Sequence, residues 1–181
     1  AGRTEKEVKK ILLTVDADDM AVKKAVESGA DMIVSHHPLI FKPIKSVTDG
    51  DFIGRRLVTM IQADISYFAM HTNFDAAPGC MADCVAKRLG IAGGAPLEEM
   101  GEEDGIPFGI GKIGPLTEPV TGKALAGKIK ERFGLPFVTV YGKEMWEEKP
   151  VTVAAVCPGS GGSVIQAALD KGAQVLVTGD I

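Results

Sequence analysis

The sequence predicts an α/β fold made of two similar halves, each containing a βαβ unit, with mainly parallel sheets and a cleft between the halves. Short apolar runs alternate with amphipathic segments along residues 1–92, a pattern typical of parallel strands joined by crossover helices. A second strand–helix–strand pattern occupies residues 151–178. The segment Ser28–Ser35 also matches Lys171–Thr178 in residue type, which indicates two related halves.

We expect three parts along the chain. Residues 1–92 form the first α/β half, residues 93–150 are a connecting loop, helix and strands, and residues 151–181 are the second βαβ half. The chain begins without a methionine and stops at the exit of a strand. We therefore expect a fragment whose second half is truncated at its C-terminus.

Three apolar runs and three helical patterns define the first half. A strand at Ile11–Val15 precedes a helix that Asp16, Asp18 or Asp19 can cap, and Gly29 ends this helix. On that helix Val22, Ala25 and Val26 lie on one face. The remaining expected elements are a strand at Met32–Ser35, a helix at Phe52–Ala63 with an apolar stripe of Ile53, Leu57, Met60 and Ile61, a strand at Ile65–Met70, and a helix at Met81–Leu89 that Gly90 stops.

The middle of the chain carries weaker signals. Ile91–Gly105 has the glycines, prolines and acidic residues of a solvated loop. The expected elements that follow are a strand at Phe108–Gly114, a helix at Gly122–Phe133 capped by Thr121, a strand at Phe137–Tyr141, and a turn at Met145–Lys149 in which Trp146 packs. The second βαβ unit then consists of a strand at Val151–Cys157, a glycine-rich loop at Pro158–Ser163, a helix at Val164–Lys171 and a strand at Val175–Thr178.

Composition excludes several classes of protein. The 181 residues include 45% hydrophobic residues, and 20 basic against 24 acidic side chains give a net charge of −4. No basic block indicates nucleic-acid binding, and no apolar run is long enough for a membrane span. Three cysteines, Cys80, Cys84 and Cys157, are too few for a disulfide scaffold. We expect a cytoplasmic protein.

Histidines stand where two of the predicted strands end. His36 and His37 follow the strand at Met32–Ser35, and His71 follows the strand at Ile65–Met70, with Asp75 four residues later. Ligands of open α/β sheets bind at the carboxyl ends of the strands, and imidazole with carboxylate suits Zn²⁺, Mn²⁺, Fe²⁺ or Mg²⁺. The sequence therefore predicts a metal site here. Taken singly, these residues also fit a turn, a core histidine or a helix cap.

Three further features leave alternatives open. Cys80 and Cys84 share a helix face as metal ligands or as buried thiols. The glycines of Pro158–Ser163 suit a phosphate-binding backbone or a tight turn. Asp180 falls at a strand end equivalent to that of the paired histidines, where it would face the same cleft as a metal ligand or as a group that supports the ligands, although Gly-Asp is also an ordinary turn.

Four motifs together resemble the GTP cyclohydrolase 1 type 2 family, also called the Ngg-one interacting factor three-like proteins. They are Ser35–Phe41, His71–Ala77, Gly159–Ser163 and Thr178–Ile181, in family order along nearly the whole chain. The resemblance implies two α/β domains, two divalent metal ions in the cleft and a homohexamer. It further implies that His36, His37 and Asp75 bind metal, and that His71 lines the cleft.

The sequence departs from the family pattern at two places. Gly79–Asp83 replaces the usual Gly-Gly-x-Asn-Asp, and the family's C-terminal His and Glu fall beyond Ile181. The resemblance implies a metal-dependent hydrolase that opens the ring of GTP or acts on a similar nucleotide. The alternatives are a non-catalytic metal-binding scaffold or protein-interaction protein, and a metal site that only holds the two halves together.

Overall fold

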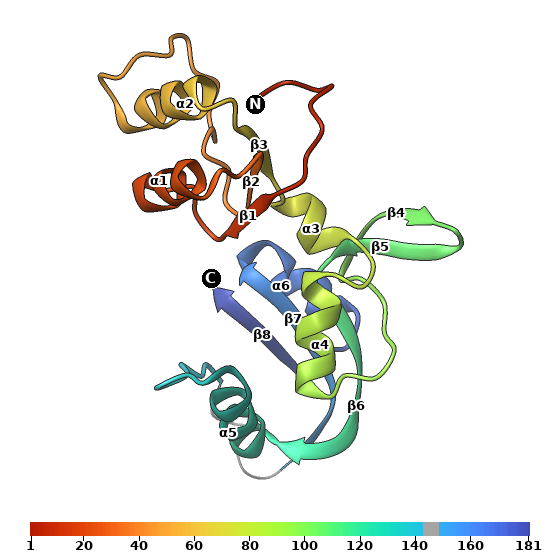
Figure 1. Cartoon of the computed structure of the whole chain (residues 1–181). Helices are drawn as coiled ribbons and strands as arrows, with labels where there is room; N and C mark the ends of the chain where they lie inside the picture. The colour runs from red at the N-terminus through yellow and green to blue at the C-terminus, as the bar shows by residue number, and fades with distance from the viewer. Residues whose placement is uncertain (143–148) are drawn as a thin grey trace. The chain divides into compact units, whose positions relative to one another are not determined.

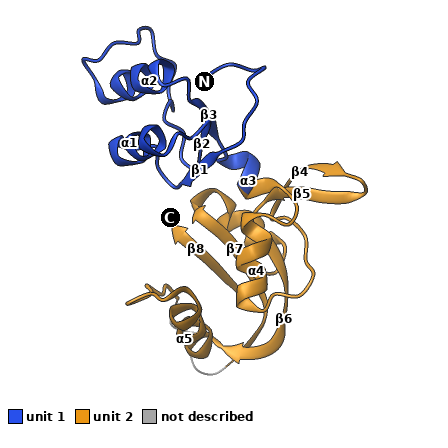
Figure 2. Ribbon diagram, in the orientation of Figure 1, with its two compact units in different colours: residues 1–74 blue, residues 75–181 orange. Residues whose placement is uncertain are grey.

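The chain folds into two compact units, Ala1–Phe74 and Asp75–Ile181, in a computed structural model that describes residues 1–142 and 149–181 (Figures 1 and 2). The three-part division expected from the sequence stays a prediction. The predicted packing of Trp146 and most of the turn around it lie outside the described residues. No helix among the described residues is long and apolar enough to cross a bilayer.

The first unit is a three-stranded parallel sheet with two helices. Its strands pair in the order β1-β2-β3, with Leu13 opposite Val34 and Val34 opposite Phe68. The elements are β1 (Ile11–Thr14), α1 (Asp19–Ser28), β2 (Met32–Ser35), α2 (Phe52–Gln62) and β3 (Ser66–Ala69), followed by the short helix α3 (Thr72–Ala76), which runs on into the second unit. The first predicted βαβ unit is therefore confirmed.

Local signals fix the ends of these helices. Asp18 caps α1, its carboxylate accepting the N–H of Ala21 at 2.7 Å, and Gly29 ends the helix in the left-handed conformation with φ 63°. Asp51 caps α2 in the same way by accepting the N–H of Gly54. Of the three predicted caps for α1, the structure selects Asp18.

One face of the first sheet packs on the helices. Ile33 and Tyr67 from the strands meet Val22, Leu57 and Met60 from the helices in a single buried cluster. The last residue of each predicted apolar stripe is not part of this core, because Val26 is 42% exposed and Ile61 is 65% exposed. Each lies at the margin of its helix face, where the short three-stranded sheet no longer covers it.

In its described residues, the second unit contains two sheets and three helices. A three-stranded sheet has the order β6-β7-β8, and β4 and β5 form a separate hairpin. The elements are α4 (Met81–Leu89), β4 (Glu98–Glu103), β5 (Ile106–Ile110), β6 (Lys112–Thr121), α5 (Gly122–Phe133), β7 (Pro150–Ser160), the 3₁₀ turn η2 (Gly162–Val164), α6 (Ile165–Asp170) and β8 (Val175–Asp180).

The prediction of mainly parallel sheets holds for the first unit and is wrong for the second. There β7 pairs with β8 in parallel but with β6 antiparallel, and β4 pairs with β5 antiparallel. A helix, α5, also stands between β6 and β7 in the chain, but these two strands run antiparallel. Only the β7–β8 ladder is therefore a parallel crossover of the βαβ kind. The fold is thus α/β with one parallel sheet and further mixed sheets.

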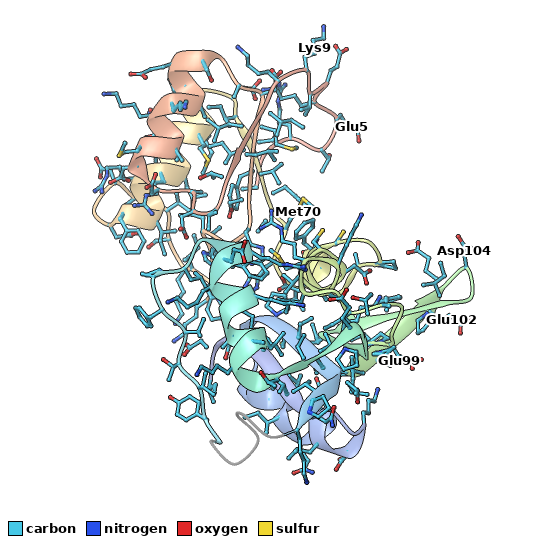
Figure 3. The ribbon with its side chains drawn as sticks, turned by 90° about the horizontal axis from the view of Figure 1, so that it is seen from below. Glu5, Lys9, Met70, Glu99, Glu102 and Asp104 are labelled. Carbon is cyan, nitrogen blue, oxygen red and sulfur yellow. The ribbon has the colours of Figure 1, made fainter. Side chains whose placement is uncertain are left out.

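The loop predicted at Ile91–Gly105 was wrong in its second half, which forms β4. The single strand predicted at Phe108–Gly114 is two strands, β5 and β6, separated by Gly111 with φ 64°. The acidic side chains of β4 project into solvent, as Glu99 and Glu102 do in Figure 3, and Asp104 does the same in the turn that follows. A strand with no buried face carries no alternating apolar pattern by which the sequence would indicate it.

The strand predicted at Phe137–Tyr141 is absent from the structure. Both edges of β7 are already taken by β6 and β8, and Phe137 and Tyr141 are exposed. A strand at residues 137–141 would therefore have no place beside β7, although the alternating residue pattern predicted one. The glycine-rich loop also begins later than predicted, because Pro158–Ser160 still belong to β7.

The second βαβ unit, β7–α6–β8, is confirmed as a parallel pair. The matched segments of the two halves occupy equivalent places. Each passes from the end of a helix through a glycine with positive φ, Gly29 at 63° or Gly172 at 79°, into a strand parallel to the preceding one. The internal similarity of the sequence thus reflects a repeated piece of backbone.

Candidate metal centre

The paired histidines lie directly beyond the carboxyl end of β2. Pairing with the β1 side continues past the strand, since the N–H of His36 donates to the carbonyl of Thr14 at 3.2 Å and that of His37 to Val15 at 3.0 Å. On the other side, the N–H of Met70 donates to the carbonyl of Ser35 at 2.7 Å. Backbone hydrogen bonds therefore connect the segment that carries His36 and His37 to the residues at the ends of both β1 and β3.

Three side chains of this region converge. His36, His71 and Asp75 each offer one ligand atom, and these atoms lie within 4.8 Å of one another. All three residues are half-buried. His71 directly precedes α3 and Asp75 lies four residues on, so one helical turn brings both side chains to the same side. The predicted cluster at two strand ends is present in the geometry.

His37 stands beside this group without being one of its three donors. Its ring centroid is 5.0 Å from that of His36 and 6.0 Å from that of His71. Its Nδ1 lies 2.8 Å from Oδ1 of Asp16. Among the four residues predicted near this site, the structure thus groups His71 with His36 and Asp75 and leaves His37 adjacent.

Hydrogen bonds to Nδ1 determine the tautomer of two histidines. Nδ1 of His36 lies 2.9 Å from the carbonyl oxygen of Met70. A carbonyl has no proton to give, so Nδ1 must donate and the Nε2 of a neutral ring keeps its lone pair. The carboxylate of Asp16 imposes the same tautomer on His37. Metal-binding histidines are commonly oriented in this way by a carbonyl or a carboxylate.

The donor set fits a divalent cation. Two imidazole nitrogens and one carboxylate oxygen match the three protein ligands of catalytic zinc sites, in which a further position stays open. The same donors suit Mn²⁺ and Fe²⁺. His37, with its own oriented ring, is a third imidazole and a fourth donor residue in the immediate neighbourhood. The ligand roles of these residues stay predictions.

Asp180 and the three cysteines do not belong to the group of converging donors. Asp180 is exposed at the end of β8, where its carboxylate accepts the N–H of Ile181. Cys80 and Cys84 flank the start of α4 and belong to no metal-capable group among the described residues. Cys157 is buried, and burial raises the pKa of its thiol, with the negative charges of Asp75 and Glu98 adding to the effect.

Tight packing accounts for the glycine-rich segment. A Cβ on Gly161 would lie 2.5 Å from Oγ1 of Thr178, and the N–H of Gly161 already donates to the carbonyl of Asp180. Gly159 has φ 76°, which favours glycine. Of the two interpretations left open by the sequence, the structure supports the tight turn.

Sequence reasoning missed the residues that hold the histidines. Asp16 was interpreted only as a helix-cap candidate, and Ser35 and Tyr67 only as strand residues, although their hydroxyl groups contact the histidine turn. A polar side chain at a core-facing strand position was the available signal for Ser35 and Tyr67.

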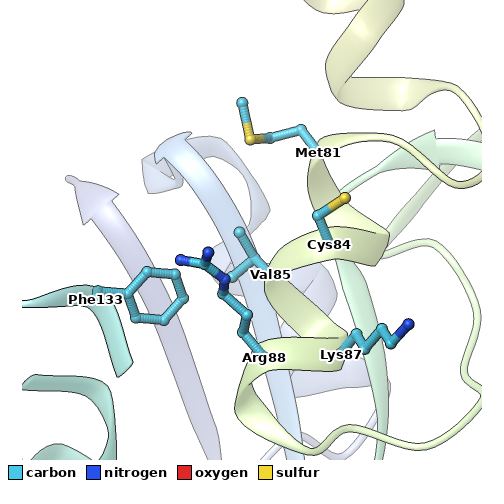
Figure 4. Close-up of a pocket in the computed structure, with 6 residues that line it drawn as sticks. All are labelled: Met81, Cys84, Val85, Lys87, Arg88 and Phe133. Atoms are coloured by element: carbon cyan, nitrogen blue, oxygen red, sulfur yellow. The ribbon is translucent and has the colours of Figure 1, made fainter. Parts of the chain in front are cut away.

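A separate open groove of about 590 Å³ lies on the second unit. Its lining residues are shown in Figure 4 and are Met81, Cys84, Val85, Lys87 and Arg88 from α4 with Phe133 from α5. The guanidinium of Arg88 lies 5.6 Å from the centre of the Phe133 ring. The groove is apolar with a basic rim and holds none of the predicted metal ligands.

Comparison with known families places these features in context. The sequence model of a family described as Duf34/NIF3 (NGG1p interacting factor 3) matches residues 1–181. A GTP cyclohydrolase 1 type 2 homolog from Streptococcus pneumoniae is 34% identical over 181 residues, which cover 99% of this chain and 66% of that protein. NIF3-like protein 1 of Drosophila melanogaster is 29% identical over 179 residues, or 98% of this chain and 59% of that protein. The chain thus spans about two thirds of the length of these relatives, or less.

Solved structures share the fold. The hypothetical protein SA1388 of Staphylococcus aureus superposes with a TM-score of 0.83 at 27% identity, covering 99% of this chain and 70% of that one. A Bacillus cereus protein related to NIF3 gives a TM-score of 0.86 at 23% identity, covering 100% of this chain and 75% of that one. Both likenesses extend over essentially all of the residues described above.

Proposed function

We propose, from the premise that the chain belongs to the Duf34/NIF3 (NGG1p interacting factor 3) family, that it is a metal-dependent hydrolase with a dinuclear site. The family resemblance found in the sequence is confirmed by this membership. The observation that carries the proposal is the convergence of His36, His71 and Asp75 within 4.8 Å, with Nδ1 of His36 held against the carbonyl oxygen of Met70.

Each residue has a distinct task in this proposal. His36, His71 and Asp75 would hold one divalent ion, and His37 would contribute to a second. The second ion would need further donors besides these four residues. Divalent ions at such a site supply Lewis-acid polarisation of the substrate and activation of water. Asp16 and the carbonyl of Met70 keep His37 and His36 in the ligating tautomer.

The proposed substrate is a nucleotide or a similar heterocycle. Relatives from several bacteria carry the name GTP cyclohydrolase 1 type 2 homolog, which supports hydrolytic ring opening of GTP as the first reaction to test. A phosphoester is the second substrate class, because the same metals act on it. We further propose a cytoplasmic homohexamer, as the family resemblance implies.

A non-catalytic role is the second candidate. The family description, NGG1p interacting factor 3, supports a metal-binding scaffold or protein-interaction protein. In that case the ions organise the exits of β2 and β3 without turnover. A purely structural ion would leave the same signature, a rise in melting temperature with metal and no reaction.

Turnover separates these functions. Purified protein loaded with Zn²⁺ or Mn²⁺ is incubated with GTP and the products are followed by chromatography. The hydrolase proposal predicts turnover that Asp75→Ala abolishes and that Glu99→Ala, a change of an exposed hairpin carboxylate, leaves intact. Metal-loaded protein that turns over neither GTP nor a phosphoester panel would instead support the scaffold.

A further inference from the structure

We infer that Tyr67 is a positioning residue for the metal centre, acting through the turn that carries His36 and His37. Its metal-binding part rests on the proposed function. Tyr67 lies in β3 and is buried. The hydrogen bonds of its hydroxyl go to Ser35 and to the backbone of the turn, not to the side chains of His36, His71 or Asp75.

The hydroxyl of Tyr67 reaches both sides of Pro38. It lies 2.7 Å from the backbone nitrogen of Leu39 and 3.2 Å from the carbonyl oxygen of His37. It also lies 2.7 Å from Oγ of Ser35, which in turn lies 2.7 Å from the same carbonyl of His37. Two buried side chains thus contact the polar backbone groups flanking the proline.

A single assignment of protons satisfies the three short contacts. The N–H of Leu39 donates to the Tyr67 oxygen, the Tyr67 hydroxyl donates to Ser35, and the Ser35 hydroxyl donates to the carbonyl of His37. Each hydroxyl then donates once and accepts once. Buried polar networks rigidify a structure when every member is satisfied, and this one is.

The turn needs such support because β pairing ends beside it. The last backbone bonds on the β1 side are those of His36 and His37, and Pro38 has no N–H with which to continue them. The carbonyl of His37 and the N–H of Leu39 are therefore held by side chains of β2 and β3. Leu39 itself is buried in the core of the first unit, which locks the far side of the turn.

The end of β3 also orients the ring of His36. The carbonyl oxygen of Met70, directly after β3, accepts the Nδ1 proton of His36, while the hydroxyl of Tyr67 within β3 accepts the N–H of Leu39. The chain from Tyr67 to Met70 therefore sets the position of the turn and the rotation of one ring together. Loss of the Tyr67 hydroxyl is expected to loosen the imidazoles without removing a ligand atom.

The test uses Co²⁺ alone as the probe, because its visible spectrum reports the ligand geometry. We compare the unmodified protein with two variants. Tyr67→Phe removes only the hydroxyl oxygen. Ile33→Val changes a buried residue on the same face of the sheet, opposite Tyr67 on β2, that makes no polar contact with the turn. The dissociation constant of Co²⁺ is expected to rise about 10–100-fold in Tyr67→Phe, the range for groups that orient ligands. It should change by less than about twofold in Ile33→Val, a substitution that costs stability without touching ligands.

Unchanged Co²⁺ affinity and spectrum in Tyr67→Phe would overturn the inference, as would an equal loss in Ile33→Val. Amide exchange of Leu39 gives a second readout without metal. Its protection should fall sharply in Tyr67→Phe and persist in Ile33→Val. If the unmodified protein binds no Co²⁺, the proposed function fails, and Leu39 exchange alone decides whether Tyr67 holds the turn.

Discussion

Nδ1 of His37 lies 2.8 Å from Oδ1 of Asp16, so the exit of β1 supplies the carboxylate that orients an imidazole at the exit of β2. Both side chains are more than half exposed, and an exposed ion pair of this kind stabilises a fold little. The contact has a clearer role in fixing the tautomer of His37.

We therefore predict that Asp16→Ala weakens binding of Zn²⁺ while barely changing the melting temperature. The expected loss is about tenfold or more in affinity, because His37 then lacks the acceptor that orients it. Titration calorimetry checks the affinity, and Asp49→Ala, which removes an exposed carboxylate from the loop before α2, is the control. Equal affinities in the two variants would contradict the assigned role of Asp16.

Metal should stabilise the protein through Asp75. A ligand present at about one hundred times its dissociation constant stabilises the native state by about 2.7 kcal/mol. We expect saturating Zn²⁺ to raise the melting temperature of the unmodified protein and to leave that of Asp75→Ala nearly unchanged. Asp180→Ala, at the end of β8, is expected to keep most of the rise. A full rise in Asp75→Ala would remove this residue from the site.

The sequence predicted the elements whose signals are local. Asp18 and Gly29 bound α1, and Thr121 and Gly134 bound α5, because a cap depends on a few adjacent residues. The sequence did not predict the hairpin β4–β5, because β4 is almost entirely acidic and exposed. Its one local signal was Asp104–Gly105, whose φ values of 52° and 77° are those of a tight hairpin turn.

The site was predictable in residue type and only partly in geometry. His36, His37, His71 and Asp75 stand out by their places after two strands. Which rings converge depends on the pairing of β2 with β3 and on the turn of α3 that brings Asp75 beside His71. Neighbours on an extended backbone point to opposite sides, so the His-His pair alone could not indicate that His36 joins the group and His37 stands beside it.

Two helical glycines, one in each unit, give a matched test of helix packing. A Cβ on Gly54 of α2 would lie 1.9 Å from the carbonyl oxygen of Thr48, whereas a Cβ on Gly127 of α5 would meet no atom within 4 Å. Gly54→Ala should cost about 1–3 kcal/mol through overpacking. Gly127→Ala should stabilise by up to about 1 kcal/mol through helix propensity. Urea denaturation measures both, and a neutral Gly54→Ala would show that the loop before α2 yields without cost.

Acid should weaken the second unit through Asp83. Burial is the largest influence on this carboxyl and raises its pKa, but the hydrogen bonds from Lys112 and from the N–H of Gly79, with the charge of Lys112, outweigh it and leave the pKa below 3.8. A depressed folded-state pKa contributes stability above the unfolded value, and this contribution is lost as the pH falls through the folded one.

Asp83→Asn should therefore lower stability at pH 7 by about 1–2 kcal/mol, in the range of hydrogen bonds to charged groups. The difference from the unmodified protein should shrink progressively below pH 4. Denaturation curves recorded between pH 7 and pH 2 check this, with Asp104→Asn at the exposed hairpin turn as the control. A difference that does not change with pH would mean that the Asp83 charge is not what stabilises the unit.

Metal content per chain tests the central claim most directly. The unmodified protein, the double variant His36→Ala/His71→Ala and the single variant His37→Ala are equilibrated with Zn²⁺, desalted and measured by elemental mass spectrometry. We predict at least one ion per chain in the unmodified protein, retention of that ion in His37→Ala, and its loss in the double variant. Equal zinc in the unmodified protein and the double variant, or no zinc in either, would contradict a metal centre formed by His36, His71 and Asp75.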